Sequence, residues 1–138
     1  AYTLRHSDTP VVALVGMGAM ITETIAAGDR LAEQGIAADI VCVTSPGLLF
    51  EASQARRALS KRTSWILDQV FPANRAAPMV TVLDGHPHTL AFLTGINNVP
   101  GAALGISEFG QAGSLHDVYR YHGVDTDSIV RAALDLVS

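Results

Sequence analysis

Short apolar runs recur along this 138-residue chain and predict its strands. They span residues 11–15, 40–44, 79–83 and 102–106, and none shows a regular alternation of polar positions. Continuous apolar runs of this length are typical of strands that are buried on both faces of a parallel sheet. The sequence therefore predicts a buried strand at each of these positions.

Helical periodicity separates these runs. Across residues 19–34 the apolar positions repeat at intervals of three and four, and Gly35 stands where a glycine commonly ends a helix. The residues expected to face inward are Ile21, Ile25, Gly28 and Ala32. Shorter helices are predicted over residues 48–59, 64–70 and 88–93.

The end of the chain carries clear signals for helix boundaries. Ser114 and Asp117 have the spacing of a capping box, and Gly123 stands at a helix-ending position. Asp125 is placed to cap a final helix. One apolar stripe is expected along that helix, formed by Ile129, Val130, Ala133, Leu134 and Val137.

The alternation of strands and helices predicts an α/β fold. We expect a single domain over residues 1–138, a three-layer α/β/α arrangement around an open, mostly parallel, twisted sheet of about five strands. Such sheets bind ligands beyond the carboxyl ends of their strands. The candidate anion- or ligand-binding edge consists of Gly16, Gly18, Thr44 and Ser45.

Composition and charge narrow the classes of function. Apolar residues make up 49% of the chain and charged residues 16%, which excludes an intrinsically disordered protein. With a net charge of −4 and scattered basic residues, the chain has no nucleic-acid-binding patch. No apolar run approaches the ~18 residues of a membrane span. We expect a cytoplasmic protein, and the low charged fraction and the start at Ala1 suggest a piece of a longer polypeptide.

The sequence offers no catalytic residue. Gly16-Met17-Gly18 departs from the dinucleotide-binding fingerprint because Ile21 occupies the place of the third glycine. No Gly-x-Ser-x-Gly elbow is present, and Lys61, the only lysine, lies in no catalytic pattern. The single cysteine, Cys42, lies within an apolar run and is expected to be buried and inert.

Asp84, His86 and His88 form the densest polar cluster in the sequence. They are metal-ligating residue types, but structural zinc needs four ligands and no second cluster supplies the others. A loop at the sheet edge is the favoured interpretation, and a contact with a neighbouring domain is a second one. Phe109 is a further candidate for that contact, and Trp65 is either a core residue or an interface anchor.

The order of these features resembles the C-terminal domain of the transketolase-like, thiamine-diphosphate-dependent enzymes. At the end of the chain the resemblance rests on Phe109-Gly110, Leu115, His122-Gly123, Ile129-Val130 and Ala133-Leu134. At the beginning it rests on Tyr2-Thr3-Leu4, Gly16-x-Gly18 and the segment from Asp39 to Ser45. Arg56 and Arg57 lie where homodimeric pyruvate dehydrogenase decarboxylase components carry a polar helical insertion, so the chain is most similar to those components.

The resemblance implies a supporting domain rather than a catalytic one. Thiamine diphosphate and Mg²⁺ would be bound by other parts of the parent enzyme, a pyruvate dehydrogenase-type oxidoreductase. The cofactor motif itself is missing, because Asp84-Gly85 lacks the preceding glycine and Asn97-Asn98 follows too soon. The expected partners are the other domains of the parent chain, a second copy in a homodimer, and a dihydrolipoyl acyltransferase.

Several alternatives remain open. Many relatives carry Asp-Tyr-x-Lys where this chain has Asp84-Gly85-His86-Pro87-His88, so the parent could act on another 2-oxo acid. A transketolase-type parent is a further possibility. A free-standing domain that binds an anion or small molecule at the carboxyl edge is another. The last is an independent enzyme with Asp84, His86 and His88 as metal ligands.

Overall fold

A computed structural model describes residues 1–57, 65–106 and 123–137. The strands are β1 (Tyr2–Arg5), β2 (Val12–Met17), β3 (Ala38–Val43), β4 (Met79–Val82) and β5 (Gly101–Leu104). The α-helices are α1 (Ile21–Glu33), α2 (Pro46–Arg56), α3 (Trp65–Val70), α4 (His88–Ala91) and α6 (Thr126–Val137). Short 3₁₀ turns are η1 (Gly18–Met20), η2 (Ala73–Arg75) and η3 (Phe92–Gly95). The predicted helix after Ser114 lies outside the described residues.

The strands form one five-stranded sheet in the order β1-β3-β2-β4-β5. β3, β2, β4 and β5 pair in parallel, and β1 pairs antiparallel with β3. From β2 the chain moves to β3 on one side and then crosses back to β4 on the other. The connections diverge between β2 and β4, which makes the carboxyl ends of these two strands the topological switch point of the sheet.

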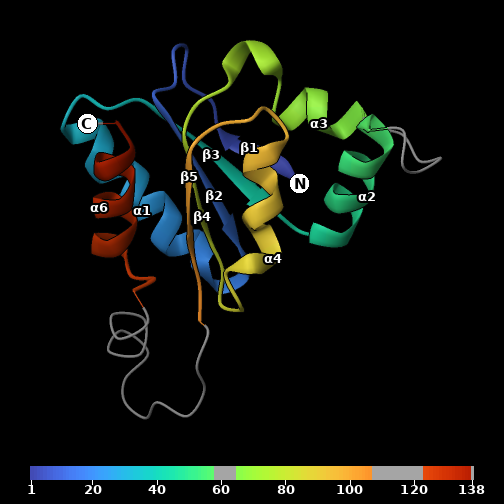
Figure 1. The fold of residues 1–138 in the computed structure, drawn as a ribbon. Coiled ribbons are helices and arrows are strands. Elements are labelled where there is room, and N and C mark those ends of the chain that lie inside the picture. Colours follow the sequence, from blue (N-terminus) through green and yellow to red (C-terminus); the bar gives the residue numbers. More distant parts are fainter. Residues whose placement is uncertain (58–64, 107–122, 138) are drawn as a thin grey trace.

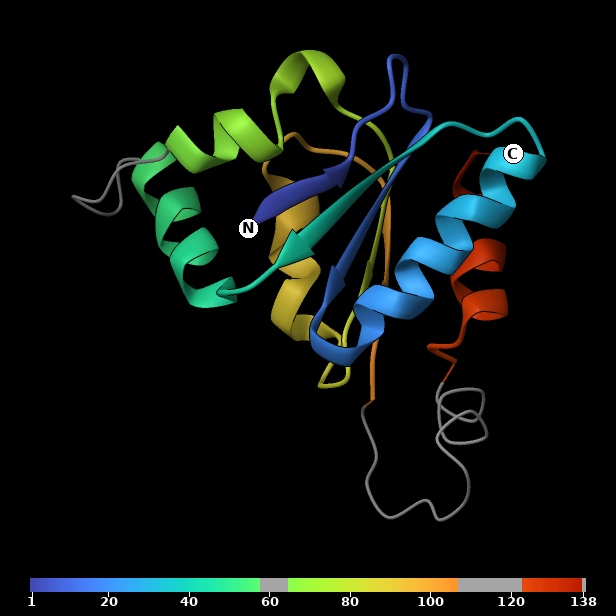
Figure 2. The same ribbon diagram turned by 180° about the vertical axis from the view of Figure 1, so that it is seen from behind.

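Helices cover both faces of the sheet, as the sequence predicts (Figure 1). One core lies under α1 and α6 and includes Leu14, Leu31 and Ile129. The other lies under α2, α3 and α4 and includes Val41, Leu67 and Leu90. The view from behind shows α1 and α6 side by side, in agreement with their contacts (Figure 2). The predicted three-layer α/β/α architecture is confirmed.

The inward face of α1 differs from the expected one. Its buried residues are Thr24, Ala27, Gly28 and Leu31, so of the four predicted residues only Gly28 is fully buried. Thr24 tolerates burial because its hydroxyl donates a hydrogen bond to the Met20 carbonyl at 2.6 Å. The prediction missed this face because hydropathy ranks isoleucine above threonine as a buried residue. It does not account for a threonine whose hydroxyl hydrogen-bonds to the backbone of its own helix.

The sequence patterns locate four strands and miss β1. All of its residues are exposed, so no buried apolar run marks it. It is an edge strand, hydrogen-bonded only to β3, with an irregularity in register between Thr3 and Arg5. Tyr2 lies opposite Cys42, and a hydrogen bond with the buried thiol raises the pKa of the Tyr2 hydroxyl above its ordinary value.

Other boundary signals fall where the sequence places them. Gly35 and Gly123 have positive φ angles of 77° and 71°. These left-handed conformations suit glycine at the end of a helix. The side chain of Asp125 accepts a hydrogen bond from the Ser128 amide at 3.2 Å and so caps α6. The apolar stripe of α6 buries Ile129, Val130 and Ala133.

A partly buried ion pair ties the connection between β1 and β2 to the rest of the sheet. Arg75 Nη2 lies 3.1 and 3.2 Å from the two carboxylate oxygens of Asp39. The same guanidinium donates to the carbonyls of Ser7 and Asp8, and the Ser7 amide donates to Asp39 at 2.7 Å. Asp39 therefore acts as a structural anchor at the amino end of β3.

Candidate functional site

The candidate ligand-binding edge is divided among three places. Gly16 is buried inside β2, where an added Cβ would overlap the hydroxyl of Thr24 on α1. Gly18 is exposed at the switch point, whereas Thr44 and Ser45 follow β3 and line a separate cavity. Gly16 thus allows α1 to approach the sheet closely, and the other residues lie where a ligand could reach them.

The carboxylate of Asp84 lies directly beside Gly18. A Cβ built on Gly18 would lie 3.0 Å from Asp84 Oδ1, so the loops after β2 and β4 meet at the switch point. Gly18 has a φ of +65°, which any larger residue rarely adopts. Because like charges repel, this carboxylate disfavours phosphate or another anion at the glycine turn.

His86, in the loop after β4, and His88, the first residue of α4, are exposed and contact each other. Their rings are 4.3 Å apart between centroids, and their Nδ1 atoms face each other. The backbone N–H of His88 also points at His86 Nδ1 at 3.3 Å. Within the described residues no three His, Cys, Asp or Glu side chains gather, so Asp84 does not complete a metal centre with this pair. The expectation of a domain contact at these residues remains a prediction, and Phe109 lies outside the described residues.

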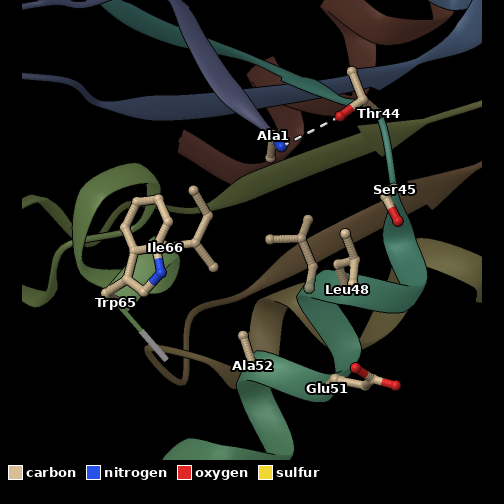
Figure 3. Close-up of a pocket in the computed structure, with 9 residues that line it drawn as sticks. Ala1, Thr44, Ser45, Leu48, Glu51, Ala52, Trp65 and Ile66 are labelled. Carbon is tan, nitrogen blue, oxygen red and sulfur yellow. Dashed lines mark hydrogen bonds between the residues drawn. The ribbon is translucent and has the colours of Figure 1, made fainter. Parts of the chain in front are cut away.

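A cavity of about 300 Å³ lies between α2 and α3, beside the N-terminus. Figure 3 shows Trp65 and Ile66 of α3 on one wall and Leu48 and Ala52 of α2 on the other. Its remaining lining residues are Ala1, Thr44, Ser45, Leu49 and Glu51. The wall is mostly apolar, which suits hydrophobic contact better than the recognition of a charged group.

Trp65 is an exposed residue rather than a core residue, with 63% of its surface accessible. Leu48, on the facing wall, is 60% exposed, and neither it nor Ala1 was a site residue in the sequence analysis. The only feature of the sequence that pointed to this cavity was a tryptophan, Trp65, in a short predicted helix. Leu48 could be placed on the cavity wall only once the side of α2 that faces the sheet was known. The buried residues Leu49 and Ala52 define that side.

The residues described here do not fit thiamine diphosphate or its metal ion. The switch point presents the Asp84 carboxylate where a diphosphate would need N–H donors or cations. No basic residue is among those that line the cavity.

None of the helices in the described segments combines the length and hydropathy that crossing a membrane requires.

Comparison with known proteins identifies the family. Residues 1–125 match the family model described as the transketolase-like TK C-terminal domain. The chromosomal transketolase of Cupriavidus necator is 29% identical over 132 residues, which are 96% of this chain and 18% of that protein. The chain thus spans less than a fifth of the length of this curated relative.

Solved transketolases share the fold. The Campylobacter jejuni enzyme superposes with a TM-score of 0.70 at 18% identity, over 97% of this chain and 18% of that one. A split-gene transketolase, described as an inactive β4 tetramer, gives a TM-score of 0.66 at 18% identity, over 94% of this chain and 40% of that one. The comparisons do not confirm the closer resemblance to pyruvate dehydrogenase decarboxylase components. The five-stranded sheet, its helical layers and the family match together show that this chain belongs to the transketolase-like C-terminal domain family.

Proposed function

We propose that this chain is the non-catalytic C-terminal domain of a transketolase-type, thiamine-diphosphate-dependent enzyme. In this proposal the cofactor and Mg²⁺ are bound by other parts of the parent polypeptide, and the domain supports those parts and the homodimer. The family match over residues 1–125 is the observation that carries the proposal. The poor fit of the described residues to a diphosphate supports it, since the domain would then need no cofactor of its own.

A transketolase-type parent replaces the pyruvate dehydrogenase-type parent as the main proposal. The curated relative reported above is a transketolase, and so are the two solved structures. Nothing in these comparisons supports an oxidoreductase or a dihydrolipoyl acyltransferase partner. The family resemblance alone supports a thiamine-dependent parent, and the transketolase relatives favour transfer of a ketol group over oxidative decarboxylation.

The proposal is tested by assaying the complete gene product beside residues 1–138. With thiamine diphosphate, Mg²⁺, a ketose phosphate donor and an aldose phosphate acceptor, the complete protein should form the exchanged sugar phosphates. Residues 1–138 should give no product under the same conditions, and omission of thiamine diphosphate serves as the control for the complete protein. Turnover by residues 1–138 alone would contradict the supporting role. Decarboxylation of pyruvate in place of ketol transfer would contradict the transketolase assignment.

A further inference from the structure

Two imidazole nitrogens face each other beyond the carboxyl end of β4. They are the Nδ1 atoms of His86 and His88, whose ring centroids are 4.3 Å apart. Two imidazole nitrogens that both present a lone pair repel each other, so a proton or a metal cation between them stabilises the pair. Both rings are exposed, which leaves this position open to an ion from solvent. The arrangement therefore has the character of a chelate with two nitrogen ligands.

The backbone that carries the two histidines is held in place. The Ile106 amide donates to the Gly85 carbonyl at 2.8 Å, and the Thr89 amide donates to the His86 carbonyl at 3.1 Å. Pro87 separates the two histidines and has a φ of −60°, the angle that its ring enforces. Because this backbone is fixed before a ligand arrives, binding does not have to order it.

The position and the charge of the pair favour a cation. The loop after β4 lies at the switch point of the sheet, where open α/β sheets commonly bind ligands. The exposed carboxylate of Asp84 brings negative charge to the same loop. The sequence contains no lysine or arginine between Arg75 and Arg120. The residues around the pair in sequence thus supply negative charge and no permanent positive charge.

We propose that His86 and His88 together bind one divalent transition-metal ion, with Zn²⁺ as the representative ion. Imidazole suits Zn²⁺, Cu²⁺ and Ni²⁺, whereas Mg²⁺ prefers oxygen ligands, so the site is distinct from the Mg²⁺ of the proposed function. The ion displaces the long hydrogen bond, 3.3 Å, from the His88 amide to His86 Nδ1. Because both side chains are exposed, the rings can turn to admit Zn²⁺ at its usual distance of about 2.0–2.1 Å from nitrogen.

Two protein ligands make this an open site rather than a structural one. Structural zinc has four protein ligands, and an open site leaves positions for water or for a ligand from another molecule. The described residues bring no third His, Cys, Asp or Glu side chain to the pair, in agreement with an open site. The inference goes beyond the proposed function and does not depend on it, because the two histidines bind the ion without the rest of the parent enzyme.

Zinc titration of the complete gene product tests the proposal. Isothermal titration calorimetry, in buffer with excess Mg²⁺, compares the native protein with the variants His86→Ala and His88→Ala. Each substitution should weaken the binding of one Zn²⁺ per chain by at least about 10-fold, because a chelate needs both nitrogens. His6→Ala is the matched control, since it removes an exposed histidine from the loop after β1, and it should leave zinc binding unchanged.

Electron paramagnetic resonance with one equivalent of Cu²⁺ counts the ligands. The native protein should show coupling to two imidazole nitrogens, and each variant to fewer. Equal zinc binding by the native protein and both variants would overturn the inference, and so would a loss in only one of them. No zinc binding by the native protein would show that a proton rather than a metal lies between the rings, and would also overturn it. Ketol transfer is measured separately, so failure of the metal site leaves the proposed function standing.

Discussion

Single glycines determine how closely the α1 layer approaches the sheet. An added Cβ at Gly16 would overlap the hydroxyl of Thr24, and one at Gly28 would lie 2.6 Å from Ile40 Cδ1. Both glycines therefore serve packing between α1 and the strands, because a larger residue at either position would force the facing side chain to shift. The importance of Gly16 lies in the core rather than at a ligand-binding edge.

We predict that Gly16→Ala destabilises the fold by about 1–3 kcal/mol, the usual cost of overfilling a packed site. Gly47→Ala is the matched control, because nothing lies within 4 Å of a Cβ at that helical position. It should leave the free energy of unfolding unchanged or raise it by about 0.5–1 kcal/mol. Urea denaturation of both variants measures the difference. Equal stabilities would show that α1 can shift away from β2 at little cost.

At the scale of elements, the ion pair of Arg75 and Asp39 joins parts of the chain that are distant in sequence. It connects η2, the amino end of β3 and the turn that follows β1. Because the two side chains are only 19% and 14% exposed, loss of one partner leaves the other poorly solvated. The pair thus contributes more than a surface ion pair would.

We predict that Arg75→Ala lowers the free energy of unfolding by about 1–3 kcal/mol, because Asp39 loses its cationic partner and two carbonyls lose a donor. Arg30→Ala is the control, since it removes an ion pair with Asp127 in which both side chains are at least half exposed. That change should cost at most about 1 kcal/mol. Chemical denaturation checks both values. A smaller loss for Arg75→Ala than for Arg30→Ala would refute the structural role of the pair.

At the scale of the whole molecule, different helices of the described residues cover the two faces of the sheet. On one face α1 and α6 pack against each other. On the other face α2 and α3 leave the cavity open toward the N-terminus (Figure 3).

The exposed position of Trp65 predicts the fluorescence of this residue, the only tryptophan in the chain. In residues 1–138 alone, the native emission should already resemble that of tryptophan in water and should be quenched readily by acrylamide. Unfolding should change it little, because the indole is exposed beforehand. Native emission at clearly shorter wavelength, shielded from acrylamide, would show that the side of the molecule around Trp65 is closed.

The sequence by itself determined the order of the four parallel strands and the helices between them, the three layers and the caps. These features depend on local patterns: continuous apolar runs for buried strands, helical periodicity between them, Gly35 and Gly123 at helix ends, and Asp125 at the start of α6. The family resemblance followed from the same local motifs, although the comparisons do not confirm the pyruvate dehydrogenase branch that it favoured.

Only the tertiary structure decided which residues share a surface. β1 carries no local burial signal, since its place depends on pairing with residues 35 to 40 positions later in the chain. The buried side of α1 depends on a threonine that satisfies its own hydroxyl. The meeting of Ala1, Leu48 and Trp65 depends on how α2, α3 and the N-terminus pack across the sheet. Such contacts arise from long-range packing, which the spacing of residues along the chain does not encode.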